Sequence, residues 1–257
     1  MKIAVAGKGG VGKTTVSAEL AKYFAQEGFT VFAVDADPDL SLGYFLGFPE
    51  ELILKLRPLV EMREDILAQS GGKGAFYTLN PDVDELLAKY VLQKENIKFL
   101  KMGGLKRGGT ECYCRENAVL RAVISNLLLE KKEIVILDMG AGIEHLTRGT
   151  SEGVDLMLIV TEPTKTSVQS AKVIAKLAEE LGIKNIQFIG NKVHCSADYE
   201  FLKQNFASNL ALVIDYEEEV LKESRGEVVQ NKKLTQAIVG LGELLLRRVA
   251  EKQVIQI

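Results

Sequence analysis

The sequence predicts a doubly wound α/β fold, in which helices cover both faces of a mainly parallel sheet. Three observations support this prediction: short runs rich in β-branched residues recur, helical patterns separate them, and each run is almost continuously apolar. Strands that are buried on both faces have this pattern, whereas the strands of a half-exposed sheet alternate polar and apolar residues. The alternation of strands and helices favours parallel strand order.

The elements are expected in the following order. Residues 2–6 form a first buried strand, and residues 16–28 form an amphipathic helix that ends at a glycine. Further strands are expected at 30–35, 133–138, 155–161, 186–191 and 210–215, and further helices at 115–132, 167–182 and 234–252. Residues 50–110 have a weaker pattern, with a proline-interrupted helix and glycine turns. We therefore expect residues 1–257 to form one domain with an insertion at about 50–110.

Composition narrows the functional classes. The chain has 257 residues, of which 47% are hydrophobic and 26% charged, and its net charge of −3 gives no basic field for nucleic acid. Three cysteines do not make a secreted disulfide framework. The N-terminal apolar run is too short for a signal peptide, and no run approaches the roughly 18 residues of a spanning helix. We expect a cytoplasmic protein that binds neither nucleic acid nor a membrane.

The clearest motif is GKGGVGKTT, between the first strand and the first helix. It matches the dinucleotide fingerprint G-x-G-x-x-G, for which Asp35 stands where a ribose-binding acid is expected. It also matches G-x-x-x-x-G-K-[ST], in which Lys13 reaches the β- and γ-phosphates and the Thr14 hydroxyl binds Mg²⁺. A dinucleotide site needs neither group, so the motif favours a triphosphate. The loop residues expected to bind nucleotide are Gly9, Gly10, Val11, Gly12, Lys13, Thr14 and Thr15.

Lys8 places a second lysine at the start of the loop. With it, the loop resembles the deviant Walker A motif of the SIMIBI/MinD-type P-loop ATPases, which include the nitrogenase iron protein, MinD/ParA partitioning ATPases and arsenite-pump ATPases. In that family the extra lysine reaches the nucleotide of the partner subunit. The resemblance implies an ATP-hydrolysing homodimer with ATP or ADP between subunits, in which Lys8 and Lys13 take part in catalysis.

Two further segments follow the family pattern. VDADPD resembles switch I, and Asp37 matches the residue that orients the attacking water; Asp39 is a weaker candidate. IVILDMGAG resembles the Walker B strand and switch II, which implies that Asp138 holds Mg²⁺ together with Thr14. A carboxylate at the end of one buried strand is common, so the interpretation depends on the nearby phosphate loop.

The family's base-contacting segments also have counterparts. NKV matches the adenine-contacting pair, which gives Asn191 and Lys192. VIDYEEEV resembles the second base-binding segment, which gives Ile214 and Asp215, with Tyr216 as a weaker candidate.

The stretch GGTECYCRENAVL contains Cys112 and Cys114. Three interpretations are open: two ordinary thiols, a redox pair, or half of a metal site. A redox pair is disfavoured because its usual spacing is C-x-x-C. A closed soft-metal site needs four ligands, which two chains supply if the loop lies near the two-fold axis. An alternative site combines the pair with His145 or recruits Cys195, while His194 is more often structural.

A C-x-C pair in such a dimer resembles the nickel-insertion ATPases that mature carbon monoxide dehydrogenase (the CooC type). DMGAGIEHLTRGT and VDADPD extend this resemblance. It implies Ni²⁺ bound through Cys112 and Cys114 at the dimer interface, and carbon monoxide dehydrogenase as the client. Zn²⁺ is also expected in purified protein, because tetrahedral sulfur sites select it well.

Two other functions remain open: a MinD/ParA-like positioning ATPase, and an iron–sulfur carrier or scaffold ATPase. The terminal segment LLLRRVAEKQVIQI can imitate MinD's membrane-binding helix, although a helix docked on the domain is the favoured interpretation.

Overall fold

A computed structural model describes residues 1–37, 40–62, 65, 88–103, 132–140, 154–224, 227 and 232–254. Within these residues the strands form one eight-stranded sheet, in the order β3-β4-β2-β5-β1-β6-β7-β8. The strands are β1 (Lys2–Gly7), β2 (Thr30–Ala36), β3 (Leu92–Lys94), β4 (Ile97–Lys101), β5 (Glu133–Met139), β6 (Leu156–Thr161), β7 (Ile186–Val193) and β8 (Leu210–Asp215).

Every neighbouring pair of strands is parallel except β3 and β4. The central strand β1 lies between β5 and β6, and β2 pairs with β5 so that Asp35 is the register partner of Asp138. The carboxyl ends of β1, β2 and β5 therefore meet at one edge of the sheet, where ligands bind in open α/β folds. The predicted fold class is confirmed.

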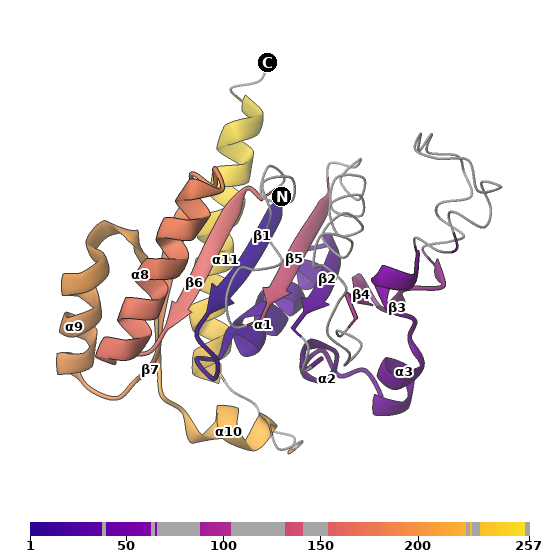
Figure 1. The fold of residues 1–257 in the computed structure, drawn as a ribbon, viewed down its shortest axis with the longest axis horizontal. Coiled ribbons are helices and arrows are strands. Elements are labelled where there is room, and N and C mark those ends of the chain that lie inside the picture. The colour runs from indigo at the N-terminus through magenta and orange to yellow at the C-terminus, as the bar shows by residue number, and fades with distance from the viewer. Residues whose placement is uncertain are drawn as a thin grey trace, which may run out of the picture.

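Helices cover both faces of the sheet (Figure 1). One face packs on α8 (Lys165–Glu180) and α9 (Ser196–Phe206), and the other on α1 (Lys13–Gln26) and α11 (Lys232–Val254). Successive residues of β1 alternate between the two cores, as the pleat of a strand requires: Ala4 faces α8, and Ile3 and Val5 face α1. Both faces of the sheet are thus buried, which explains the continuous apolar strands.

The region predicted to be an insertion contributes two strands to the sheet. β4 continues the parallel sheet beyond β2, and β3 pairs antiparallel with β4. β4 was not predicted, because Lys98 and Lys101 interrupt its apolar pattern. Lys98 lies over the Phe32 ring at 4.9 Å, and the buried Lys101 ammonium donates to the Ile53 carbonyl at 2.8 Å, near the end of α3. The prediction of one domain with an insertion stays a prediction.

Several short elements complete the described chain: α2 (Leu42–Phe45), α3 (Glu50–Lys55), η1 (Leu59–Glu61), η2 (Ala207–Asn209) and α10 (Glu218–Ser224). The helix expected at 167–182 begins at Lys165, because the Thr164 side chain accepts the Ser167 N–H and caps the first turn. The helix expected at 115–132 lies outside the described residues, apart from its last position.

The terminal helix α11 docks on the domain over its described part. Leu234, Ile238, Leu241 and Leu245 are buried in the core that α1 shares, at helical spacing. At Gly242 a Cβ atom would meet the Tyr23 ring, so glycine allows the two helices to approach closely. Among the described residues, no helix is both long and apolar enough to cross a bilayer.

Candidate nucleotide-binding site

The glycine loop connects β1 to α1. Gly12 has a φ of 96° and precedes the first helical residue, Lys13, whose side chain is buried. The left-handed φ at Gly12 suits glycine, and the turn presents the first N–H groups of α1 at the helix N-terminus. This end of a helix attracts phosphate through free N–H donors and the helix dipole.

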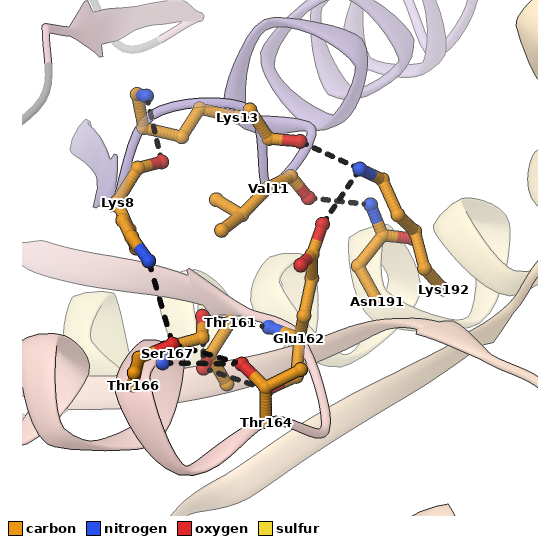
Figure 2. Close-up of polar contacts among 11 residues, drawn as sticks. Lys8, Val11, Lys13, Thr161, Glu162, Thr164, Thr166, Ser167, Asn191 and Lys192 are labelled. Atoms are coloured by element: carbon orange, nitrogen blue, oxygen red, sulfur yellow. Dashed lines mark hydrogen bonds and ion pairs between the residues drawn. The ribbon is translucent and has the colours of Figure 1, made fainter.

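The end of β7 contacts the loop directly (Figure 2). The Asn191 side-chain amide donates to the Val11 carbonyl at 2.7 Å, and the Lys192 ammonium donates to the Gly10 carbonyl, also at 2.7 Å. At Gly12 a Cβ atom would lie 2.3 Å from Asn191 Nδ2, so a larger residue would displace this contact. Asn191 and Lys192 are predicted to contact the base; in the structure the Asn191 amide and the Lys192 ammonium also hold the phosphate loop.

The two lysines of the motif differ in solvent exposure. Lys13 is buried and donates to the Lys8 carbonyl at 3.3 Å. Lys8 is exposed, and its ammonium lies 3.4 Å from the Thr166 hydroxyl at the start of α8 (Figure 2). A cation at the N-terminus of a helix opposes the helix dipole, so this contact is weak and Lys8 is free to move to an anion.

Asp138 lies at the end of β5, beside the first turns of α1. The Ser17 hydroxyl donates to Asp138 Oδ1 at 2.9 Å, whereas Oδ2 is buried and has no hydrogen-bond partner among the described residues. Burial raises the pKa of Asp138 to about 6, although the hydroxyls of Thr14 and Ser17 and the Lys13 ammonium lower it. A buried carboxylate oxygen without a partner fits a hard cation. Thr14 and Asp138 are therefore suitable residues to hold Mg²⁺.

Asp35 is fully buried beside Asp138 and is not available to a ribose. Its carboxylate accepts the Asp37 N–H at 3.1 Å and the Leu42 N–H at 2.9 Å, so it closes the turn that carries Asp37. Burial and then the Asp138 carboxylate raise the pKa of Asp35 to about 7. This arrangement is inconsistent with the dinucleotide interpretation, in which Asp35 would contact a ligand.

A pocket of about 510 Å³ lies between the ends of β7 and β8, and its lining includes Val193, Asp215 and Tyr216 but neither Asn191 nor Lys192. His194 stacks on Tyr216 with ring centroids 4.6 Å apart, and the Tyr216 N–H donates to the Val193 carbonyl at 2.8 Å. Asp215 is exposed and lines the pocket, whereas Ile214 is buried in the core and is not among the lining residues.

The predicted metal ligands Cys112 and Cys114 lie outside the described residues, as do His145 and Asp39. Cys195 is exposed at the start of α9. Within the described part of the chain, no group of three or more His, Cys, Asp or Glu side chains is arranged to hold a metal ion. The alternative that recruits Cys195 thus gains no support from the described residues.

Four residues around the loop have roles that were not assigned from the sequence. Ser17 and Thr166 lie inside helices, and Glu162 lies in the segment 162–164 between β6 and α8, for which no role was predicted. Asp35 was considered only as a ribose ligand. Ser17 bonds Asp138 and Thr166 bonds Lys8, and each contact joins residues at least 121 positions apart in the sequence. No local pattern reveals such contacts.

The fold and this site define a P-loop ATPase. The family model described as "CobQ/CobB/MinD/ParA nucleotide binding domain" matches residues 2–238. The chain belongs to this family.

Two relatives cover most of the chain. The "Uncharacterized ATP-binding protein MJ0823" of Methanocaldococcus jannaschii is 44% identical over 230 residues, covering 86% of this chain and 88% of the relative. The "Carbon monoxide dehydrogenase accessory protein CooC" of Rhodospirillum rubrum is 42% identical over 205 residues, covering 79% and 78%.

The solved structure of the septum site-determining protein MinD from Pyrococcus horikoshii, complexed with Mg-ADP, is similar in fold. Its TM-score is 0.68 at 20% identity, and the match covers 95% of each chain.

Proposed function

We propose that this protein is an ATP-hydrolysing, homodimeric metallochaperone that carries nickel for insertion into carbon monoxide dehydrogenase. The observation that carries the proposal is the 42% identity with the carbon monoxide dehydrogenase accessory protein CooC. The C-x-C pair, Cys112 and Cys114, supplies thiolates suited to a soft or borderline metal.

The nucleotide roles are proposed from the site geometry. Lys13 and the N–H groups that open α1 bind the phosphates, and Thr14 and Asp138 hold Mg²⁺, which neutralises charge on the transferred phosphoryl group. Asp37 follows β2 at the same sheet edge and orients the attacking water. The His194–Tyr216 pocket, with Asp215 on its wall, receives the base.

The dimer is proposed from Lys8. Its ammonium is exposed and weakly held in its own chain, so it can reach the nucleotide of a partner subunit. Two chains would then bring four cysteine thiolates to one tetrahedral site for nickel, or for zinc in purified protein. ATP-dependent closure would change the spacing of the two C-x-C pairs and so couple nucleotide binding to metal binding.

Metal analysis of the purified protein, combined with its mass with and without a non-hydrolysable ATP analogue, tests this proposal. We expect one nickel per dimer, which is lost in Cys112→Ser and in Cys114→Ser while ATP hydrolysis remains. Cys195→Ser is the matched control, because Cys195 is exposed and belongs to no ligand group in the described residues, so it should keep the metal. One metal per monomer would refute the shared site.

A second candidate is a MinD/ParA-like positioning ATPase, which the family model and the MinD fold favour. Sedimentation with anionic liposomes and with DNA distinguishes it, since a positioning ATPase binds one of them when ATP is present. The iron–sulfur alternative predicts broad visible absorption from anaerobically purified protein, which a nickel carrier would lack.

A further inference from the structure

The phosphate loop is held from one side by the strand β7. The carbonyls of Gly10 and Val11 accept hydrogen bonds from Lys192 and Asn191. Because a trans peptide places its C=O and N–H on opposite sides, the N–H groups of Val11 and Gly12 point away from β7. Successive N–H groups that face one direction form an anion-binding concavity. The contacts from β7 therefore orient donors for phosphate.

Lys192 does not hold the loop alone. Its ammonium also donates to Glu162 Oε1 at 2.6 Å, so one nitrogen bridges a carbonyl of the loop and a carboxylate of the β6–α8 segment (Figure 2). Lys192 has a φ of 58°, and the pairing of β7 with β8 shifts register between Gly190 and Val193. Left-handed backbone in a residue other than glycine is uncommon and costs free energy, so surrounding contacts must hold Lys192 in this conformation.

Glu162 is itself fixed by hydroxyls at the start of α8. Its N–H donates to the Ser167 hydroxyl at 3.0 Å, and Ser167 is also 3.0 Å from the Thr161 hydroxyl. The Ser167 N–H in turn donates to Thr164 Oγ1. These bonds hold the backbone of the segment, so Glu162 presents its carboxylate to Lys192 from a defined position.

We propose that Glu162, acting through Lys192, is a positioning residue that sets the phosphate-binding conformation of the loop. The contact Glu162–Lys192–Gly10 is called the loop latch below. In it, Glu162 neutralises the Lys192 ammonium and keeps it on the Gly10 carbonyl, where it turns the Val11 N–H toward phosphate. The inference rests on the proposed nucleotide role of the loop and adds a residue that the motif does not contain.

A purely electrostatic role for Glu162 predicts the opposite effect on binding. Its negative charge near a phosphate site would repel the ligand, so Glu162→Gln would strengthen ATP binding. The loop latch predicts weaker binding, because glutamine holds the ammonium less firmly and the Gly10 peptide is no longer fixed. The sign of the change separates the two roles.

The test compares wild type with Glu162→Gln, Lys192→Met and the double variant. In the presence of Mg²⁺, each protein is titrated with ATP and, separately, with inorganic tripolyphosphate, which has no base. We expect each single variant to weaken both ligands by about three- to fivefold, as fits a partly exposed ion pair. The double variant should bind each ligand no more weakly than the weaker-binding single variant, because both substitutions break the same contact. Lys192→Arg should restore most of the affinity, and KM for ATP should rise more than kcat falls.

Glu19→Gln is the matched control. Glu19 pairs with Lys22 at 2.7 Å on α1, an ion pair of similar length that does not contact the loop. It should leave both affinities unchanged, and urea unfolding should show all variants folded.

Stronger binding in Glu162→Gln, or additive losses in the double variant, would overturn the loop latch. A loss for ATP with no loss for tripolyphosphate would also overturn it and assign Lys192 to the base. If the wild type binds ATP and Glu162→Gln matches it, the inference alone fails. If the wild type binds neither ligand, the proposed nucleotide site fails as well.

Discussion

Ser17 Oγ donates to Asp138 Oδ1 at 2.9 Å, and this bond fixes a buried carboxylate whose other oxygen has no hydrogen-bond partner among the described residues. The bond joins the first helix to the end of β5 across 121 positions of sequence. Because Ser17 occupies one oxygen, the other remains available to a cation. The metal requirement of the enzyme should therefore depend on Ser17, which acts through Asp138.

Ser17→Ala should raise the Mg²⁺ concentration that gives half-maximal ATP hydrolysis by about tenfold, because a hydrogen bond to a charged group is lost. The measurement is a Mg²⁺ titration of ATPase activity at saturating ATP. Ser170→Ala is the control, since the Ser170 hydroxyl bonds only a backbone carbonyl on the exposed side of α8. An unchanged Mg²⁺ requirement in Ser17→Ala would refute the role of this bond.

Asp35 should make the protein less stable as pH rises. Its pKa is about 7 in the folded chain, because of burial and the Asp138 carboxylate, and about 4 when unfolded. The folded state then binds the proton more tightly, so the stabilising contribution is complete below pH ~4 and is lost between pH ~4 and ~7. Urea unfolding without Mg²⁺ should show wild type losing stability relative to Asp35→Asn across this window.

Asn is the informative replacement, because it keeps one acceptor for the two N–H groups and cannot ionise. Asp35→Asn should have a lower free energy of unfolding than wild type at pH 4, where Asp35 is neutral and favourable in the folded state. This difference between the two proteins should narrow toward pH 7. A gap that is constant from pH 4 to pH 7 would show that Asp35 does not titrate in this range.

Asp37→Asn should slow ATP hydrolysis by about 100-fold or more and leave the affinity for ATP within about twofold. The reason is that general-base assistance acts on the attacking water and only weakly on bound substrate. Single-turnover hydrolysis and equilibrium binding measure the two quantities separately. A parallel loss of affinity would indicate that Asp37 instead holds the nucleotide or its metal.

Lys8→Ala should abolish ATP-induced dimerisation while the monomer still binds ATP. Lys8 is exposed, and its 3.4 Å contact with Thr166 adds little to stability, so the variant should unfold like wild type. Light scattering with a non-hydrolysable ATP analogue measures the mass. Lys22→Ala, which removes a lysine on α1 away from the loop, is the control and should dimerise normally. A dimeric Lys8→Ala would place the lysine outside the interface.

Much of the sheet could be predicted from the sequence, because strands buried on both faces keep continuous apolar runs. β8 has the predicted limits 210–215, and β2 and β5 are each one residue longer than predicted. β4 was missed because Lys98 and Lys101 interrupt its pattern: one lies over an aromatic ring, and the other bonds the carbonyls of α3. Lysines packed in this way interrupt the apolar pattern by which a buried strand is predicted.

The placement of residues was predictable where a motif is contiguous and not where it depends on packing. Lys13 and Asp138 lie at one edge of the sheet, because the parallel strands β1 and β5 end together there, and their roles in binding stay predictions. Asn191 and Lys192 also donate to carbonyls of the loop, contacts that no local pattern predicts, and their base contact stays a prediction. Asp35 has the residue type of a ligand-binding acid but is buried under backbone N–H groups, a distinction that only the fold makes.

The central claim is that ATP and nickel are coupled across a two-fold axis, and calorimetry tests it most directly. Nickel is titrated into the protein with and without a non-hydrolysable ATP analogue, and the reciprocal titration is made with and without nickel. The account predicts one nickel per dimer, an affinity that differs at least fivefold between the two states, and the same factor in the reciprocal experiment. Identical nickel affinity in both states, or binding that survives in the Cys112→Ser, Cys114→Ser double variant, would contradict it.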